Sequence, residues 1–281
     1  MHWQSVTIIG VGLIGGSLGL ALRRAGVADR IVGVGRDAKR LSEAVRRGLI
    51  TQATTNLEEG VAEAELVVVC SPVDRIADHA LRALRASPRR AVVTDVGSTK
   101  RSIVRAVERY GAQEARRFVG GHPIAGSEQR GAASARDDLF TCRTVVLTPT
   151  ARTDPKAVLR IKRLWESVGA RTVSMKAEQH DRILASTSHL PHLVAAALAA
   201  ATPTRYLEFA GTGWADTTRI ASGDVDLWVA IAMDNRKPLL RAIEKFQNQL
   251  ERLRIALAGQ DTRSLKSALR KGKKHRDALG S

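Results

Sequence analysis

Residues 120–128, with the sequence G-G-H-P-I-A-G-S-E, place one histidine in a setting that favours acid–base chemistry. His122 lies between a pair of glycines and a proline, which together hold the backbone in an extended, well-defined form. Imidazole has an ordinary pKa near the working pH, so a positioned histidine is suited to proton transfer. A lone histidine is more often structural. Glycines on both sides indicate crowding by a ligand, and they favour a catalytic role for His122.

A second group of polar residues lies in residues 179–192, Q-H-D-R-I-L-A-S-T-S-H-L-P-H. With steps of about 100° per residue, a helix would bring Asp181, Ser188 and His192 to one face. Polar groups on an otherwise apolar helix need partners or a wet cleft, so we assign these three to a ligand site. Pro191 is expected to bend the helix about one turn before itself and to open space there.

The segment G-V-G-L-I-G-G-S, residues 10–17, follows an apolar strand and opens a helix, as a dinucleotide-binding turn requires. Gly10 permits the tight turn, Gly12 lets the backbone approach a pyrophosphate, and Gly15 allows close packing of helix on strand. The start of the helix adds amide donors and a positive dipole. The pattern therefore predicts a nicotinamide dinucleotide cofactor. The expected contacts are Gly10, Gly12, Leu13, Ile14 and Gly15, together with Ser71 and Pro72 at the end of another buried strand.

The end of the second expected strand bears on the choice between NAD and NADP. NAD sites usually carry an acid there, about twenty residues after the glycines, to bind the ribose 2′-hydroxyl. This sequence has Gly35 and Arg36 at that place. Loss of the carboxylate removes repulsion toward a 2′-phosphate, and Arg36 can pair with that group, so NADP is favoured. Asp37 keeps NAD possible, because a shift of two residues restores an acid. The alternative for Arg36 is a solvated loop residue.

Two more residues are candidates for contacting a ligand. Ser98, in V-G-S-T-K, follows a buried strand at the carboxyl edge of the expected sheet, where such sheets bind ligands. It can serve near the nicotinamide, and it is equally suited to cap the helix that begins near Lys100. Arg219, in A-D-T-T-R-I-A, is a candidate for gripping a carboxylate with its planar fork. The alternative is a surface arginine paired with Asp216.

The first part of the chain must supply the elements that hold these residues. Apolar runs separated by helical patterns imply parallel β-α-β units and a doubly wound α/β sheet of the Rossmann type. We assign this dinucleotide-binding domain to residues 1–174. The expected strands lie at 6–9, 31–34, 66–70, 91–94, 118–119, 144–147 and 171–173.

The second part of the chain shows no strand pattern. Long stretches rich in alanine and leucine occur at 185–201, 227–233 and 238–257, and the last has apolar residues at helical spacing. We therefore predict an all-helical domain over residues 175–281. Such an amphipathic helix packs on its own core or forms a subunit interface, and the sequence leaves both open.

The composition is that of a water-soluble globular protein with an excess of positive charge. The chain has 281 residues and carries 45 lysines and arginines against 28 acids, a net charge of +17. No apolar run reaches the roughly 18 residues of a membrane span, and the start has no basic leader pattern. Its two cysteines favour a reducing cytosol over a disulfide framework. We therefore expect a cytoplasmic protein without a membrane partner, and no metal-ligand cluster is recognised.

Taken together, the motifs resemble the prephenate/arogenate dehydrogenase family. The match includes the glycine-rich start, residues 120–128, the H-D-R-x-x-A-x-x-S-H-L-P-H pattern of 180–192, and D-T-T-R-I-A at 216–221. The motifs occur in order and span nearly the whole chain. The resemblance implies a cytosolic homodimer that dimerises through its helical domain. It also implies oxidative decarboxylation of prephenate or arogenate with NAD or NADP, in tyrosine biosynthesis.

The resemblance also implies roles for individual residues. His122 corresponds to the catalytic histidine that bonds the ring hydroxyl, and Ser98 to the serine between that hydroxyl and the nicotinamide. Arg219 corresponds to the arginine that grips the ring carboxylate, and His192 to the histidine near the substrate side chain. The remaining pocket residues that it implies are Asp181, Glu128 and Trp228.

Two other functions compete with this interpretation. Another dehydrogenase with a Rossmann and a helical domain, of the β-hydroxyacid or imine reductase type, would share the glycine motif but not the His122 and Arg219 segments together. A non-catalytic NADP-binding sensor that binds nucleic acid is motivated by the positive charge, part of which lies in residues 263–276. We do not expect a nucleic-acid partner, because no aromatic residues interleave with these charges. We expect that stretch to be a solvated, frayed tail.

Overall fold

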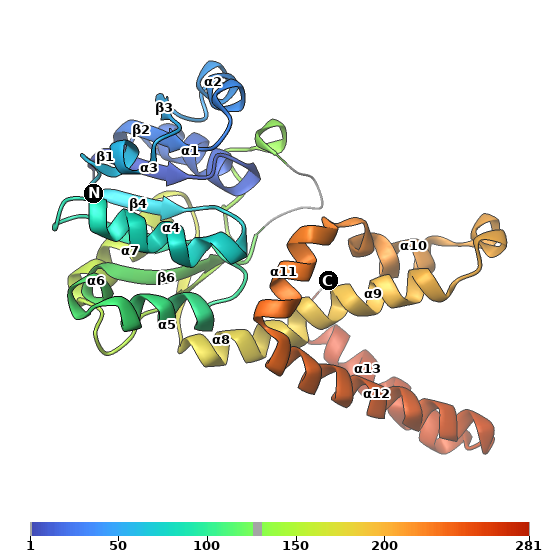
Figure 1. The fold of residues 1–281 in the computed structure, drawn as a ribbon. Coiled ribbons are helices and arrows are strands. Elements are labelled where there is room, and N and C mark those ends of the chain that lie inside the picture. Colours follow the sequence, from blue (N-terminus) through green and yellow to red (C-terminus); the bar gives the residue numbers. More distant parts are fainter. Residues whose placement is uncertain (1, 126–130, 281) are drawn as a thin grey trace. The chain divides into compact units, whose positions relative to one another are not determined.

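The computed structural model of the chain describes residues 2–125 and 131–280 (Figure 1). These fall into two compact units, residues 1–235 and 236–281. The first unit contains the whole sheet and the helices up to α11, and the second contains α12 and α13. The domain boundary predicted after residue 174 lies inside the first unit, at the end of the last strand, and stays a prediction.

Eight strands form one sheet in the order β3-β2-β1-β4-β5-β6-β7-β8, which confirms the predicted α/β Rossmann-type architecture. All neighbouring strands are parallel except β6 and β7, which are antiparallel, an arrangement that the sequence analysis did not predict. The short β3 was also missed, because three residues carry too little periodicity to stand out. The strands are β1 (Trp3–Ile9), β2 (Ala28–Val34), β3 (Gln52–Thr54), β4 (Leu66–Val69), β5 (Val92–Asp95), β6 (Phe118–Pro123), β7 (Thr144–Thr148) and β8 (Arg171–Ser174).

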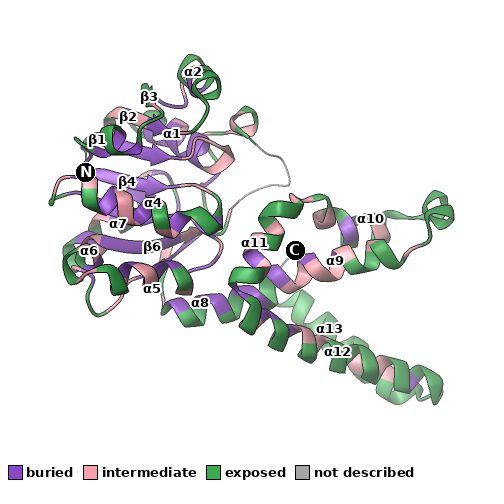
Figure 2. Cartoon of the chain, viewed as in Figure 1, coloured by how far each residue is buried: buried purple, intermediate pink, exposed green. Residues whose placement is uncertain are grey.

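Helices cover both faces of this sheet, so its central strands are apolar on both sides. In β4, Leu66 and Val68 join a core with α1 and α7, while Val67 and Val69 join a second core with α4 and α5. Figure 2 shows the strands largely buried between these layers. The helices of this part are α1 (Leu13–Ala25), α2 (Ala38–Arg46), α3 (Leu57–Val61), α4 (Val73–Ala86), α5 (Arg101–Tyr110), α6 (Ala112–Arg117), the short η1 (Ala132–Ser134) and α7 (Pro155–Ser167).

After β8 the described chain is entirely helical, as predicted. In the first unit, η4 and η2 both pack along α9, and α11 packs against α4 beside the sheet. The remaining elements of this unit are α8 (Ala177–Leu184), η2 (Ala185–His189), α9 (Leu190–Ala201), η3 (Thr204–Phe209), α10 (Thr212–Thr218), η4 (Arg219–Ser222) and α11 (Val225–Asp234).

The bend predicted before Pro191 takes the form of one wide turn. Between α8 and α9, η2 is a π-helical segment in which the amide of Leu190 donates to the carbonyl of Ala185. Pro191 has no amide hydrogen and its ring would clash with the carbonyl of Thr187, so the wider turn relieves both problems. The prediction that Asp181 and His192 share one helix face assumes a constant step of about 100° per residue. The wider turn between them interrupts that step.

The stretch Ala177–Ala201, which spans α8, η2 and α9, is long and apolar enough to cross a membrane by length and composition alone. The core helix of a globular protein passes the same test. Here the stretch contains the buried polar residues His180, Asp181, His189 and His192. Buried polar groups of this kind need partners, and His180, Asp181 and His189 find theirs in neighbouring elements of the same unit.

The second unit consists of α12 (Arg236–Ala258) and α13 (Thr262–Asp277), which pack on one another. Asp261 caps α13 by accepting from the amide of Ser264 at 2.9 Å. The basic stretch expected to be a frayed tail is therefore a capped helix, although none of its residues is buried. An ion pair of 2.6 Å between Lys273 and Asp277, one turn apart, adds to its stability.

Candidate active site

The glycine turn between β1 and α1 has the geometry that a dinucleotide requires. Gly10 has φ +98°, and a Cβ there would lie 2.7 Å from the carbonyl oxygen of Cys70. A Cβ on Gly15 would lie 2.1 Å from the Gly10 oxygen, so the helix packs directly on the turn. A Cβ on Gly12 would meet nothing within 4 Å. Open space above Gly12 is what the approach of a pyrophosphate needs, so these residues fit the cofactor.

The groups around this turn are suited to an anion. Helix α1 starts at Leu13, and its N-cap Gly12 makes no side-chain capping bond. The amides of the first turn, including Leu13 and Ile14, thus keep donors directed at the start of the helix. The segment of Ser71 and Pro72 lies alongside, because β4 neighbours β1 and Pro72 caps α4.

The region after β2 contains more positive than negative charge. Asp37 caps α2, accepting from the amides of Lys39 at 2.9 Å and Arg40 at 3.1 Å. One of its two carboxylate oxygens, Oδ1, is thereby engaged by the helix. Arg36 is exposed, and it is among the cationic groups that lower the pKa of His79, after the larger effect of burial. His79 in turn bonds Ser71 Oγ through Nδ1 at 2.7 Å, which ties Ser71 to α4.

His122 lies on β6 rather than in a loop, because the strand continues to Pro123 and pairs with β7. Asp95, at the carboxyl end of β5, fixes this strand by accepting from the amide of Gly121 at 3.1 Å. A Cβ on Gly121 would lie 2.7 Å from the Asp95 carbonyl oxygen, so only glycine permits this approach. Asp95 also forms a fully buried ion pair with Lys100. Together these contacts fix the position of the His122 backbone.

The ring of His122 begins a chain of hydrogen bonds. Its Nδ1 lies 2.8 Å from Nε2 of His180, and Nδ1 of His180 lies 2.8 Å from Oδ1 of Asp181. An ionised carboxylate only accepts, so His180 carries its proton on Nδ1 and accepts at Nε2. His122 therefore donates through Nδ1. Its Nε2 is left with a lone pair that can accept a proton.

Two pKa shifts agree with this assignment. Burial, with the fields of His180, Lys100 and His189, holds the pKa of His122 well below its usual range, so the ring is neutral at pH 7. Burial acts to raise the pKa of Asp181. Hydrogen bonds from His180 and from the amides of Lys100 and Arg101 outweigh it, and that pKa lies below its usual value. The ring that is to accept a proton is neutral, and the carboxylate behind it is charged.

Asp181 also determines how α5 begins. Its two oxygens accept from the amides of Lys100 at 2.8 Å and Arg101 at 3.0 Å. Lys100, the N-cap of α5, makes no side-chain capping bond of its own. The sequence made Ser98 a candidate for the cap of α5. The cap is instead the carboxylate of Asp181, which lies 80 residues after Arg101 in the sequence. Ser98 is half-buried in the bend between β5 and α5.

Asn235 contacts both Asp181 and His189. Asn235 Nδ2 donates to the carbonyl of Asp181 at 2.8 Å and to Nδ1 of His189 at 3.0 Å. Burial lowers the pKa of His189 to about 4, against the opposing fields of Asp181 and the Ser98 backbone. Asn235, at the end of α11, thus joins α8 to the neutral His189 of η2.

Two other predicted residues, His192 and Trp228, contact one another. The indole stacks on the buried ring of His192, with centroids 3.6 Å apart and planes at 12°. A Cβ on Gly223 would lie 2.7 Å from the indole nitrogen, so glycine lets this stack form. Burial lowers the pKa of His192, which keeps it neutral. Arg219 begins η4, which packs along α9, and its side chain is exposed.

Ser188 is half-buried within η2. Glu128 lies outside the described residues.

The sequence analysis missed four residues that hold the site together, namely His180, Asp95, Lys100 and Asn235. His180 was visible in the motif of 180–192, but its neighbour Asp181 drew the assignment. Asp95 and Lys100 flank V-G-S-T, and acids at the ends of buried strands are a usable signal, since buried charges must be paired. Nothing in the sequence around Asn235 marks it.

Comparison with known proteins agrees with this geometry. Residues 18–174 match the family model described as prephenate dehydrogenase, nucleotide-binding domain, and residues 176–271 match its dimerization domain. The prephenate dehydrogenase of Bacillus subtilis is 32% identical over 98% of this chain and 76% of its own length. The cyclohexadienyl dehydrogenase of Zymomonas mobilis is 32% identical over 99% of this chain and 96% of its own length.

Solved structures give the same result. The prephenate dehydrogenase of Aquifex aeolicus, crystallised with hydroxyphenyl propionate and NAD+, superimposes with a TM-score of 0.91 at 34% identity, over 99% of both chains. The Synechocystis arogenate dehydrogenase superimposes with a TM-score of 0.83 at 30% identity, over 98% of this chain and 100% of its own. Fold and site thus define an oxidoreductase with a nucleotide-binding sheet and a helical dimerization domain. The chain belongs to the prephenate dehydrogenase family.

Proposed function

We propose that this protein oxidises and decarboxylates prephenate, arogenate or both, with NADP favoured over NAD, in tyrosine biosynthesis. The observation that carries the proposal is the hydrogen-bond chain from Asp181 through His180 to His122, which leaves a proton acceptor at His122 Nε2. The relatives that act on prephenate, arogenate or cyclohexadienyl acids support the choice of substrate class.

In this mechanism His122 Nε2 takes the proton of the C4 hydroxyl. The nicotinamide, when bound, supplies the acceptor for the hydride that leaves C4. The electron pair of the bond to the C1 carboxylate enters the ring as CO₂ departs, and the ring oxygen regains the proton from His122. Aromatisation drives the reaction, so the protein contributes mainly positioning and electrostatics. As the ring of His122 becomes charged, the Asp181 carboxylate, which lies behind His180, stabilises that charge.

The other residues have binding and positioning roles in the proposal. Arg219 grips the ring carboxylate, His192 lies near the substrate side chain, and Ser98 bonds the C4 hydroxyl beside the nicotinamide. We infer that Asp181 acts through His180, since both of its oxygens already accept bonds from the protein. Ser188, Trp228 and Glu128 are assigned to the surroundings of the substrate, with Trp228 acting by stacking on His192.

The preference for NADP rests on the charges after β2. Asp37, the acid nearest to the end of β2, already caps α2 through Oδ1, which makes it less suited to bind a ribose 2′-hydroxyl. Arg36 is exposed beside the half-buried His79 and offers a donor to a 2′-phosphate. The glycine turn and the first amides of α1, with Ser71 and Pro72 alongside, would hold the pyrophosphate.

We also propose that the protein is a cytosolic homodimer formed through its helical part. The match to a dimerization domain supports this assembly. So do apolar side chains left exposed on α11, where Val225 is 71% and Met233 65% accessible. Both cysteines are free thiols, which suits a reducing compartment. Light scattering should give twice the chain mass of 30.4 kDa, and a monomer at micromolar concentration would refute the assembly.

The experiment that tests the function is a two-by-two assay of purified protein with prephenate and arogenate, each with NAD and NADP. Formation of the aromatic product with stoichiometric reduced cofactor is expected for at least one acid, and faster with NADP. Simple β-hydroxyacids serve as the control substrates. Turnover of those acids alone, or salt-sensitive nucleic-acid binding without any cofactor reduction, would refute the proposal.

A further inference from the structure

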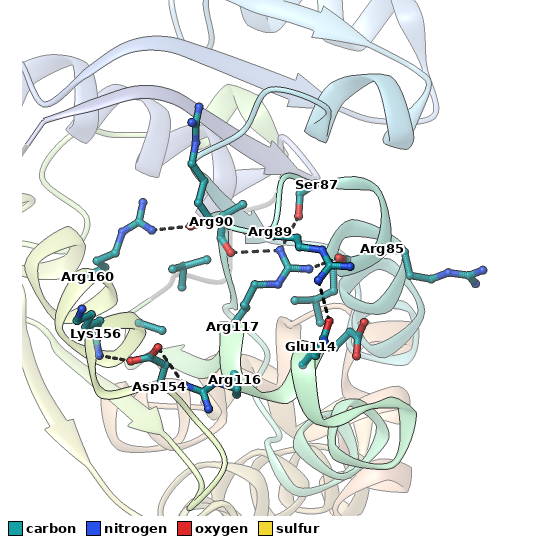
Figure 3. Close-up of a pocket in the computed structure, with 15 residues that line it drawn as sticks. Arg85, Ser87, Arg89, Arg90, Glu114, Arg116, Arg117, Asp154, Lys156 and Arg160 are labelled. Carbon is teal, nitrogen blue, oxygen red and sulfur yellow. Dashed lines mark hydrogen bonds and ion pairs between the residues drawn. The ribbon is translucent and has the colours of Figure 1, made fainter.

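A strongly basic pocket lies at the opposite end of the sheet from His122. It has a volume of about 690 Å³ and is formed by residues 84–92 at the end of α4 and directly after it, 113–117 of α6, and 154–160 at the start of α7. It lies at the amino ends of β5 and β6, and Figure 3 shows the side chains that line it. All of these residues belong to the first unit. None of them takes part in the proposed reaction.

The lining carries far more positive than negative charge. Six arginines and Lys156 line the pocket, together with two carboxylates, Glu114 and Asp154. Asp154 is engaged already, since it caps α7 at the amide of Lys156 at 2.8 Å and lies 3.7 Å from the guanidinium of Arg116. A hollow lined by one sign of charge concentrates the field and attracts anions.

Two of the arginines are fixed in place without loss of their charge. Arg117 donates to the carbonyl of Pro88 at 2.8 Å, to Ser87 Oγ at 3.4 Å and to the carbonyl of Leu84. Arg160 donates to the carbonyl of Arg90 at 2.8 Å and to that of Glu65 at 3.1 Å. Carbonyl and hydroxyl oxygens accept these bonds but do not neutralise a guanidinium.

The same two guanidiniums are partly desolvated. Burial lowers the pKa of Arg117 and of Arg160, against the opposing fields of Glu114 and Glu65. The protein therefore keeps two oriented, half-buried positive charges beneath the pocket. Nearby protein acids compensate them only in part.

Longer, exposed cations surround these fixed charges. Arg89, Arg90 and Lys156 are exposed, and Figure 3 shows them projecting from different sides of the pocket. The side chains of Arg90 and Lys156 make no hydrogen bond or ion pair among the described residues, so their donors remain available. Guanidinium and ammonium groups placed around one pocket on flexible side chains suit a ligand with several phosphate oxygens.

We propose that this pocket binds a small anion that carries two or more phosphate groups. The volume lies in the range of about 300–1,000 Å³ typical of small-molecule sites, more than one phosphate fills. The fifteen lining residues include no aromatic side chain on which a nucleobase would stack. This favours a compact polyphosphate over a nucleic-acid strand.

The site is separate from the catalytic one. β5 begins at Val92, which lines the pocket, and ends at Asp95, which bonds the amide of Gly121 in β6. β6 begins directly after Arg117 and continues past His122. Four residues of strand span about 13 Å at roughly 3.3 Å each. A ligand in this pocket therefore does not overlap with the substrate or the cofactor.

The test is isothermal titration calorimetry of the full chain with sodium tripolyphosphate in 150 mM salt. Saturating NADP is kept present so that the glycine turn is not the anion's binding site. Wild-type protein should show one saturable site per chain. Arg90→Ala/Lys156→Ala should raise Kd at least tenfold. The change keeps two main-chain hydrogen bonds of these residues. The Lys156 amide still donates to Asp154, and the Arg90 carbonyl still accepts from Arg160.

The matched control is Arg143→Ala/Arg171→Ala, which removes two exposed positive charges at the β7–β8 side of the same unit. Its Kd should change less than twofold, and thermal melting should show that both variants are folded. Absence of saturable heat in the wild type, or equal weakening in both variants, would overturn the proposal. A labelled 20-nucleotide DNA strand is the competing ligand. The proposal would also be overturned if this strand bound through Arg90 and Lys156 and tripolyphosphate did not displace it.

Discussion

His122 Nδ1 and His180 Nε2 lie 2.8 Å apart, and this one hydrogen bond determines which nitrogen of His122 is free to accept a proton. The bond joins β6 of the nucleotide-binding sheet to α8 of the helical part. The Asp181 carboxylate on the far side of His180 fixes the direction of both hydrogen bonds. A proton acceptor held in this way needs no change of tautomer before the reaction.

Replacing His122 removes the proposed proton acceptor. His122→Asn should lower kcat by about 10²–10⁴-fold, the usual contribution of a positioned acid–base group. The Kd for NADP should change little, because the glycine turn is untouched. Steady-state kinetics and a fluorescence titration of NADP measure the two effects. Unchanged turnover would remove His122 from the mechanism.

His180 should act as a positioning residue. His180→Leu deletes the acceptor for the His122 Nδ1 proton, and kcat should fall by about 10–100-fold, as for the loss of other groups that orient a functional side chain. Next to burial, His180 is the largest influence lowering the pKa of His122, so its loss should move the acid limb of kcat/KM to higher pH.

His180→Gln is the matched variant for this experiment. Its amide can accept the same bond, so part of kcat should return. A pH profile that does not move in His180→Leu, with kcat lowered only in proportion to folded protein, would reduce His180 to a structural residue.

Loss of the proposed carboxylate fork should weaken substrate binding. Arg219 is exposed in the free protein, and bound substrate would desolvate its guanidinium. Arg219→Ala should then raise KM for prephenate or arogenate by a factor corresponding to about 2–4 kcal/mol, as for truncating one partner of a desolvated charge pair. Arg182→Ala, which removes an exposed charge from α8, is the control and should leave KM unchanged. A normal KM in Arg219→Ala would contradict the assignment.

The cofactor preference should depend on Arg36. Arg36→Ala should raise KM for NADP by about 10–100-fold, the range for losing a charge-assisted hydrogen bond, while KM for NAD should hardly change. Arg46→Ala on α2, whose guanidinium is paired with Glu43, is the comparison variant. Equal effects of Arg36→Ala on both cofactors would mean that the arginine does not recognise the 2′-phosphate.

Acid should destabilise the protein in part through His189. Its folded pKa of about 4 lies below the ordinary value of 6.5, so its stabilising contribution is complete above pH 6.5 and is lost as pH falls toward 4. Between pH 7.5 and pH 5 this amounts to about 2 kcal/mol.

In His189→Gln the loss of unfolding free energy over that interval should be smaller by about 2 kcal/mol, measured by urea denaturation at both pH values. His275→Gln removes an exposed imidazole from α13 and serves as the control. The same acid sensitivity in wild type and His189→Gln would show that another group is responsible.

Local patterns predicted much of this molecule. Gly10, Gly12 and Gly15 predicted their own turn, because tight turns and close packing allow few other residues there. Alternation of apolar runs and helical stretches predicted the sheet, and alanine- and leucine-rich stretches predicted the helices after residue 174. The wide turn before Pro191 was anticipated only as a bend, because the sequence does not tell how a missing amide will be accommodated.

What the sequence by itself determined were the chemical types and their local settings: a histidine beside glycines, a glycine turn opening a helix, and an arginine in place of an acid. Only the tertiary structure decided which of these residues contact one another. His122 meets His180 58 residues away, and Lys100 meets Asp181 81 residues away. Such contacts depend on which helix packs against which end of the sheet. Periodicity reports only which side of an element is apolar, so it carries no information about that pairing.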